Sequence, residues 1–171
     1  MNKPSANEEK MPGSNKEFGD PILGMRTFTH SLPMALLSSR EAVMRKFRPL
    51  LRKYELTEQQ WRVLRALIET NNIEVTELAR QSFILSPSLS RILQNLISRR
   101  LITRHVVASD QRRSHISITP KGRTLFRTIA PQSENQYQHI ESAIGRDKLN
   151  QLYDLLAELE ASLRSADLTQ Q

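Results

Sequence analysis

The sequence of 171 residues contains no cysteine. This absence excludes disulfide bonds, metal sites built from thiolates and redox sensing through cysteine. The 4 histidines are far apart along the chain, and none forms a His-x-x-x-His pair beside a carboxylate. We therefore expect neither a bound metal nor another cofactor.

Long hydrophobic runs are also absent. No stretch approaches the ~18 uninterrupted apolar residues that a membrane helix needs, and no apolar block of the signal-peptide type occurs near the N-terminus. Glycine is scarce, with 5 residues, and 38% of the chain is hydrophobic, which is typical of a helix-rich globular protein. These features predict a cytoplasmic protein that does not enter membranes and has one domain, alone or with an appendage.

Positive charge is concentrated in about a quarter of the chain. Residues 80–123 carry nine basic side chains and one acidic side chain, so their net charge is +8, whereas the whole chain has +7. The basic residues are Arg80, Arg91, Arg99, Arg100, Arg104, Arg112, Arg113, Lys121 and Arg123. The rest of the protein is nearly neutral, which indicates a focused basic surface that binds a polyanion.

The first half of the chain contains a tail and two predicted helices. Residues 1–28 are rich in Asn, Ser, Pro and Gly and lack periodicity, which predicts a mobile tail. Apolar residues at steps of three and four predict a long amphipathic helix over 32–54. Thr57 and Gln60 have the spacing of a capping box, so a second helix is expected to begin at Thr57.

Two short helices are predicted next, in the pattern of a helix-turn-helix motif. The first covers residues 75–81. The second uses Ser86 as its N-cap and Pro87 as its first helical residue, and it runs to about Arg100. Short helices joined by a tight turn form the motif that places its second helix in the major groove of DNA.

A β-hairpin and two further helices complete the expected fold. Residues 102–106 and 115–118 alternate apolar and polar side chains, and the polar segment 108–114 separates them. Thr119 and Pro120 then begin a fifth helix, for which we expect a bend near Pro131. A last helix carries a leucine seam formed by Leu149, Leu152, Leu156, Leu159 and Leu163. The fold class is mainly α, with a small β-hairpin.

Candidate DNA-binding residues lie on the second helix of the motif and on the hairpin. On the helix they are Ser86, Pro87, Ser88, Ser90, Arg91 and Gln94. Short hydroxyl and amide side chains together with one arginine allow a helix to approach base edges closely. The alternative is an ordinary solvated helix face. At the hairpin tip, Arg112 and Arg113 are placed to enter a minor groove or to clamp phosphates, and Asp110 to orient one of them. The alternative there is an exposed turn with incidental charges.

These motifs together resemble the winged helix-turn-helix repressors of the MarR family. The matching segments are Glu77-Leu78-Ala79, Ser86-Pro87-Ser88-Leu89-Ser90-Arg91, Leu101-Ile102, Asp110-x-Arg112-Arg113 and Ile118-Thr119-x-x-Gly122. In this family the hairpin is called the wing. Ile118 departs from the more common Leu, an exchange between apolar residues. The resemblance covers residues 32–163 and implies a lobe for DNA at about 56–119 and dimerisation helices at about 32–54 and 120–164, within one domain over 29–171.

Residues 40–50 and 56–65 look like the subgroup that represses operons for aromatic-acid degradation, such as the homoprotocatechuate operon. The resemblance implies a homodimer that leaves its operator when a phenolic acid or its thioester binds. A dimer with twofold symmetry would match a palindromic operator in double-stranded DNA. The leucine seam is expected to pack against the second subunit, the alternative being an intramolecular core.

Three residues are candidates for binding the aromatic carboxylate effector. Arg40 continues the apolar series of the first long helix, so we expect it to point inward and to need an acceptor. That acceptor is either the effector carboxylate or a glutamate of the protein. Trp61 is either core or an aromatic wall of the pocket, and His30 is either structural or a further contact. Alternatives for the whole chain are an architectural DNA binder without a ligand and an enzyme that binds aromatic acids, although no nucleophile or carboxylate pair accompanies Arg40.

Overall fold

The computed structural model describes residues 26–107 and 110–169. The chain forms two compact units, residues 1–42 and 43–171. The first contains a 3-10 helix, η1 (Phe28–His30), and the start of helix α1 (Leu32–Lys53), in which the boundary between the units falls. Residues 1–25 of the predicted tail lie outside the described part.

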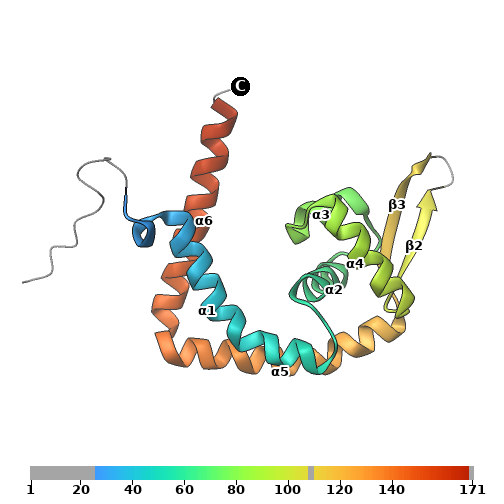
Figure 1. Cartoon of the computed structure of the whole chain (residues 1–171), viewed down its shortest axis with the longest axis horizontal. Coiled ribbons are helices and arrows are strands. Elements are labelled where there is room, and N and C mark those ends of the chain that lie inside the picture. The colour runs from blue at the N-terminus through green and yellow to red at the C-terminus, as the bar shows by residue number, and fades with distance from the viewer. Residues whose placement is uncertain (1–25, 108–109, 170–171) are drawn as a thin grey trace, which may run out of the picture. The chain divides into compact units, whose positions relative to one another are not determined.

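The second unit is built from helices that largely match the sequence-based expectation (Figure 1). After the end of α1 they are α2 (Glu58–Glu69), α3 (Val75–Ser82), α4 (Ser86–Ser98), α5 (Pro120–Ile144) and α6 (Arg146–Thr169). The capping box of α2 is confirmed: Gln60 N donates to Thr57 Oγ1 at 3.1 Å, and Thr57 N donates to Gln60 Oε1 at 2.9 Å. In the described part, no helix has the length and apolar composition needed to cross a membrane.

The start of α4 differs from the prediction by one residue. Leu85, in an extended conformation, is the N-cap, and Ser86 is already helical, so its hydroxyl does not cap the helix. Pro87 stands in the first turn, as expected, where its missing N–H costs no helical hydrogen bond. Arg99 is the C-cap, and Arg100 adopts a φ of 60°, which ends the helix earlier than predicted.

A three-stranded antiparallel sheet accompanies the helices. Its strands are β1 (Ile73–Glu74), β2 (Ile102–Val107) and β3 (Asp110–Ile118), in the order β1-β3-β2. The prediction that residues 108–114 separate the two strands of the hairpin is wrong, because β3 already begins at Asp110. Polar residues are accommodated in the strand by specific pairing: Ser114 is buried, and its Oγ accepts from Arg104 Nε at 3.0 Å. β1 was not predicted, since two residues show no alternation.

The core of the second unit lies where α2, α3, α4 and the sheet meet. Its buried side chains include Leu64, Leu67, Leu78, Leu89, Leu93, Leu96, Ile102 and Ile116. The inward orientation of Leu89, Leu93 and Leu96 confirms the predicted apolar face of α4. Each fully buried Leu or Ile side chain contributes roughly 1.5–3 kcal/mol of transfer free energy, so this face fixes how α4 turns its other side outward.

Close packing at Gly122 connects α5 to the start of β2. Thr119 caps α5 by accepting from Gly122 N at 3.0 Å. A Cβ at position 122 would lie 2.1 Å from Leu101 O and 2.8 Å from Ile118 Cγ1, so only glycine fits. The Thr119-x-x-Gly122 motif therefore has a structural cause: it fixes the base of the β2–β3 hairpin against α5.

Much of the leucine seam of α6 is exposed in the single chain. Leu152 is 42% exposed, Leu156 37% and Leu163 58%. These leucines are therefore not packed into an intramolecular core.

Candidate nucleic-acid interface and effector site

The outer face of α4 presents the residues that were predicted to approach DNA. Ser86, Pro87, Ser88, Ser90, Arg91 and Gln94 are all exposed. Ser90 Oγ donates to Ser86 O at 3.2 Å, which keeps that hydroxyl close to the backbone. Within the described part of the chain, Arg91 makes no hydrogen bond or ion pair. Its guanidinium is thus available to a base edge or a phosphate.

Several cations of the basic segment also hold the fold together. Arg99 donates to Glu55 O at 2.6 Å and to Tyr54 O at 3.1 Å, where Glu55 has a positive φ of 54°. Lys121 Nζ donates to Arg99 O at 3.0 Å. The net charge of this segment therefore describes its electrostatic field, but it overestimates the number of side chains that can reach phosphates.

An ion pair that the sequence did not indicate joins the wing to β1. Arg113 Nη2 lies 2.6 Å from Glu74 Oε2, which joins β3 to the residue before α3. The hydrogen bond from Arg113 is the main cause that lowers the pKa of Glu74. Arg113 thus has Glu74 as a carboxylate partner. The side chains of Asp110 and Arg112 lie outside the described part, so their proposed roles stay predictions.

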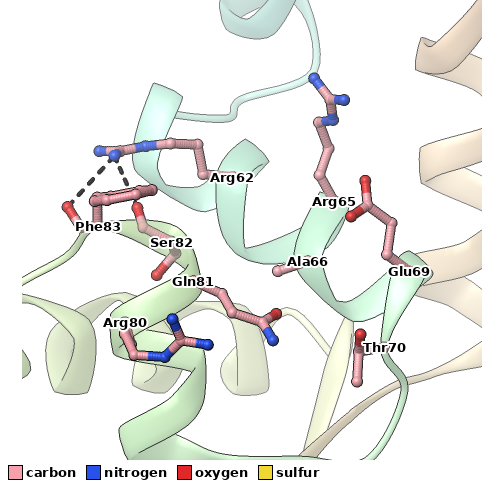
Figure 2. Close-up of a pocket in the computed structure, with 9 residues that line it drawn as sticks. All are labelled: Arg62, Arg65, Ala66, Glu69, Thr70, Arg80, Gln81, Ser82 and Phe83. Atoms are coloured by element: carbon pink, nitrogen blue, oxygen red, sulfur yellow. Dashed lines mark hydrogen bonds between the residues drawn. The ribbon is translucent and has the colours of Figure 1, made fainter. Parts of the chain in front are cut away.

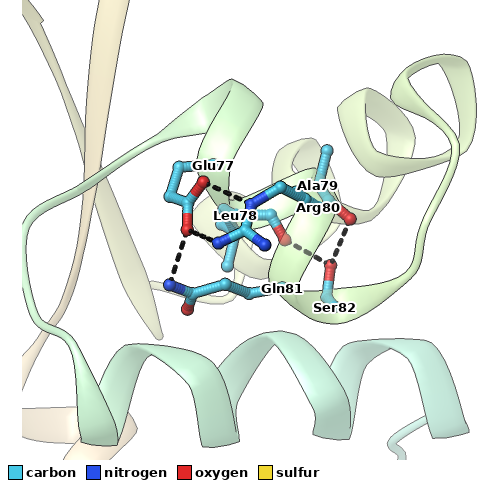
Figure 3. Close-up of polar contacts among 6 residues, drawn as sticks. All are labelled: Glu77, Leu78, Ala79, Arg80, Gln81 and Ser82. Carbon is cyan, nitrogen blue, oxygen red and sulfur yellow. Dashed lines mark hydrogen bonds and ion pairs between the residues drawn. The ribbon is translucent and has the colours of Figure 1, made fainter. Parts of the chain in front are cut away.

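The exposed face of α3 is nearly neutral. Arg80 donates to both oxygens of Glu77, at 2.8 and 2.5 Å, and Gln81 Nε2 donates to Glu77 Oε1 at 2.9 Å (Figure 3). These hydrogen bonds, that of Arg80 first, lower the pKa of Glu77 to about 2. The Glu77 carboxylate therefore stays ionised and cancels the charge of Arg80, so this pair adds no net charge to the surface of α3.

A pocket of about 480 Å³ lies between α2 and α3 (Figure 2). It is lined by Arg62, Arg65, Ala66, Glu69, Thr70, Arg80, Gln81, Ser82 and Phe83. Arg62 Nη1 donates to Ser82 O at 2.8 Å and to Phe83 O at 3.4 Å. Because Phe83 ends α3 in the left-handed region, with φ 50°, this guanidinium holds the turn of the helix-turn-helix in place.

A cluster of aromatic rings and a guanidinium lies between α2 and α5. Trp61 is 7% exposed, and its ring stacks on Phe126 with centroids 4.9 Å apart and an interplanar angle of 15°. One helical turn further, Arg65 Nη1 donates to Tyr137 Oη at 3.1 Å. The Tyr137 ring in turn contacts Phe47, with centroids 4.9 Å apart. We call Trp61, Arg65, Phe126 and Tyr137 the aromatic cluster.

Trp61 and Phe126 are packed into the hydrophobic core, whereas Arg65 is exposed. The aromatic cluster thus contains chemical groups of the kind that bind a phenolic acid. Arg65 can pair with a carboxylate bidentately, Tyr137 adds a hydroxyl, and the rings give flat apolar contact. Arg65 and Tyr137 were missed from the sequence. The available signal was the spacing of four residues between Trp61 and Arg65, which puts both side chains on one face of α2.

Arg40 and His30 belong to the other unit, residues 1–42. Arg40 is not buried in the single chain: its side chain is 45% exposed, and Nη1 lies 2.9 Å from Glu41 Oε1. Leu36 and Val43, which were expected to mark an inward stripe, are likewise exposed, at 41% and 38%. The His30 ring lies 3.0 Å from Thr27 Oγ1. Contacts of Arg40 and His30 with an effector remain predictions.

Comparison with known proteins identifies the family of this chain. Residues 54–113 match the MarR family. The chain is 40% identical over 131 residues to the homoprotocatechuate degradative operon repressor of Escherichia coli, covering 77% of this chain and 88% of that protein.

Two solved structures extend the likeness. NadR in complex with 4-hydroxyphenylacetate shares 37% identity with a TM-score of 0.71, over 80% of this chain and 98% of NadR. The repressor CouR bound to a 23-mer DNA duplex shares 26% identity with a TM-score of 0.71, over 77% of this chain and 94% of CouR. These relatives are regulators, not enzymes, which removes the enzymatic alternative. On these grounds the chain belongs to the MarR family of transcriptional regulators.

Proposed function

We propose that this protein is a homodimeric repressor that binds a palindromic operator through α4 and the wing and is released by an aromatic carboxylate. The observation that carries the proposal is the position of α2. This helix holds Trp61 and Arg65 in the aromatic cluster, and its Gln60 Nε2 donates to Asn95 Oδ1 of α4 at 2.7 Å. One helix therefore contacts both the candidate effector site and the recognition helix.

Support for DNA binding comes from the outer face of α4. Its exposed side chains include the short hydroxyls of Ser86, Ser88 and Ser90, and its first turn contains no acidic residue. Such a face can come close to base edges in a major groove, while basic side chains of the wing contact phosphates. The relative CouR was solved on a DNA duplex.

Support for the dimer comes from the apolar surface that the single chain leaves exposed. Leu36 and Leu37 of α1, and Leu152, Leu156 and Leu163 of α6, are each more than a third exposed. Leaving such stripes in water is costly, whereas a second subunit with twofold symmetry would bury them. A symmetric dimer presents two copies of α4, which suits a palindromic operator.

The proposed effector is a phenolic acid in its free form. A thioester replaces the anionic carboxylate oxygen by a neutral sulfur link, so it cannot form the charge-assisted pair with Arg65. NadR is known in complex with 4-hydroxyphenylacetate, and the E. coli relative represses the homoprotocatechuate operon. We therefore take hydroxyphenylacetates as the effector class for this protein.

The protein would release its operator if the effector binds more tightly to an arrangement of α2 that has a lower affinity for DNA. A carboxylate that competes with Tyr137 for Arg65 changes the contacts between α2 and α5, and Gln60 passes the change to Asn95 on α4. The shift in operator affinity can be no larger than the effector's preference for the released state.

A direct test begins with selection of a duplex from a random library by the full-length protein. If the dimer neutralises about eight phosphates, log affinity should fall with log salt with a slope of roughly −7. Addition of 4-hydroxyphenylacetate should then release the duplex. Selection of no duplex would refute the proposal, whereas a duplex that stays bound at saturating effector would favour the architectural alternative.

A further inference from the structure

Two large apolar side chains are strongly exposed at the turn before α4. Phe83 and Leu85 are each 80% exposed, and no large hydrophobic residue in the described part of the chain is more exposed. Ile84 between them is buried, at 6%. Most other exposed apolar residues lie on α1 and α6, where the proposed dimer would cover them. The turn lies outside those two helices and needs another explanation.

Leu85 stands at the start of the recognition helix. It is the N-cap of α4, and its carbonyl accepts from Leu89 N at 2.9 Å, so its backbone position is fixed by the helix. Ser86, Pro87 and Ser88, which follow it, are exposed and small, and no acidic residue occupies this first turn. The Leu85 side chain is therefore exposed at the N-terminal end of α4, next to residues that would meet base edges and within the most basic segment of the chain.

The chemistry of the major groove offers one apolar group to such a side chain. The edges of adenine, guanine and cytosine present donors and acceptors, whereas thymine also presents its 5-methyl group. We propose that Leu85 contacts a thymine methyl group in each operator half-site and so determines a required thymine. This inference rests on the proposed operator binding and goes beyond it by naming a base and the residue that reads it.

Phe83 serves as the matched control for Leu85. It has the same exposed fraction and lies two residues away, but it ends α3, and its carbonyl accepts a hydrogen bond from Arg62 (Figure 2). Phe83 lines the pocket between α2 and α3, whereas Leu85 does not. Removal of the Phe83 ring therefore takes away exposed apolar surface at the same turn without changing the N-cap of α4.

The experiment uses the full-length protein and the duplex that it selects from a random library. Each thymine of the duplex is replaced in turn by deoxyuridine, which removes only the methyl group and keeps base pairing. One thymine in each half-site should show an effect. Its replacement in a single half-site should lower the affinity of the parent protein about fourfold, and replacement in both half-sites about sixteenfold. Leu85→Ala, which changes both subunits, should bind the thymine duplex about sixteenfold more weakly and should no longer distinguish uracil from thymine.

Phe83→Ala should keep the full difference between thymine and uracil. The inference is overturned if no thymine shows a methyl effect, if Leu85→Ala still discriminates, or if Phe83→Ala loses the discrimination as well. Thermal unfolding of each variant shows that it is folded, and the salt dependence of its binding shows that phosphate contacts are intact. If the parent selects no duplex at all, the proposed function itself has failed.

Discussion

The Gln60 side chain donates a hydrogen bond to Asn95 Oδ1 at 2.7 Å while its own Oε1 accepts from Thr57 N at 2.9 Å. Gln60 is 8% exposed, so both ends of a buried amide are satisfied. The same residue that closes the capping box of α2 therefore also ties α2 to α4. A partly buried polar link of this kind fixes the relative position of two helices more specifically than apolar contact does.

This link predicts an energetic coupling between Gln60 and Asn95. In a double-mutant cycle measured by urea unfolding, Gln60→Ala and Asn95→Ala should be non-additive by about 1 kcal/mol, the net worth of a typical hydrogen bond. Gln94→Ala, on the exposed face next to Asn95, should change the free energy of unfolding by no more than ~0.5 kcal/mol. Additive effects of the two substitutions would mean that the hydrogen bond does not couple the helices.

Gly122 should not tolerate even a methyl group. The added Cβ of Gly122→Ala would lie 2.1 Å from the backbone oxygen of Leu101, which cannot move without displacing the start of β2. We expect a loss of roughly 1–3 kcal/mol in the free energy of unfolding, as for other overpacked sites. Ser142→Ala, at an exposed position of the same helix, is the control. Equal free energies of unfolding for the two variants would contradict the claim that close packing requires glycine at position 122.

Arg91 and Arg112 are expected to act differently on DNA. If Arg91 contacts a base as proposed, Arg91→Ala should cost about 1–3 kcal/mol and relax the preference at one operator position. If Arg112 contacts a phosphate as proposed, Arg112→Ala should weaken all duplexes to a similar extent. Affinities measured over a set of operator variants separate the two patterns. Unchanged affinities for Arg91→Ala would mean that the recognition face has been wrongly assigned.

The ion pair on α3 predicts a dependence of stability on acid pH. Hydrogen bonds from Arg80 and Gln81 lower the pKa of Glu77 from 4.5 to about 2, so the folded state favours the ionised carboxylate. Its stabilising effect is complete above about pH 4.5 and is lost as the pH falls towards 2. Glu77→Gln should therefore flatten the fall of the unfolding free energy in this window. An unchanged pH profile would show that Glu77 titrates normally.

Local signals in the sequence predicted most elements of the fold. The capping residues Thr57 and Thr119 and the inward leucines of α4 are short-range patterns, and the structure confirms them. The start of α4 was misplaced by one residue because Ser86 is a good N-cap by type, while the actual cap, Leu85, carries no capping side chain. The backbone conformation there is set by the tertiary position of the turn.

The candidate effector site could be predicted only in part. Trp61 was proposed from the sequence either as core or as a wall of the pocket, and the structure places it in the buried core. Its contact with an effector stays a prediction, and its pairing with Phe126 joins residues far apart in sequence. The contact between Arg65 and Tyr137 spans 72 positions, and nothing in the local spacing indicates it. Arg40 was favoured because helical periodicity placed it with apolar residues, of which Leu36 and Val43 are themselves exposed in the single chain. Periodicity shows which residues share a face but not what covers that face.

The two candidate arginines make separable predictions for induction. Arg65→Ala should bind the operator but lose most of its response to 4-hydroxyphenylacetate, and Arg65→Lys should recover only part of the response, since a point charge lacks the paired geometry. Arg40→Ala should also fail to release DNA if Arg40 contacts the effector in the dimer. If Arg40→Ala responds like the parent, the Arg40 assignment is wrong and Arg65 is the carboxylate residue.

The most direct measurement of the central claim compares 4-hydroxyphenylacetate with 4-hydroxyphenylacetamide, which differs only in having a neutral amide in place of the carboxylate. Fluorescence anisotropy of the labelled duplex, with each compound titrated into the preformed complex, reports release. The account predicts release by the acid and at least tenfold weaker action of the amide, because the charge-assisted pair with Arg65 is lost. Equal release by both compounds, or by neither, would contradict a repressor controlled by an aromatic carboxylate.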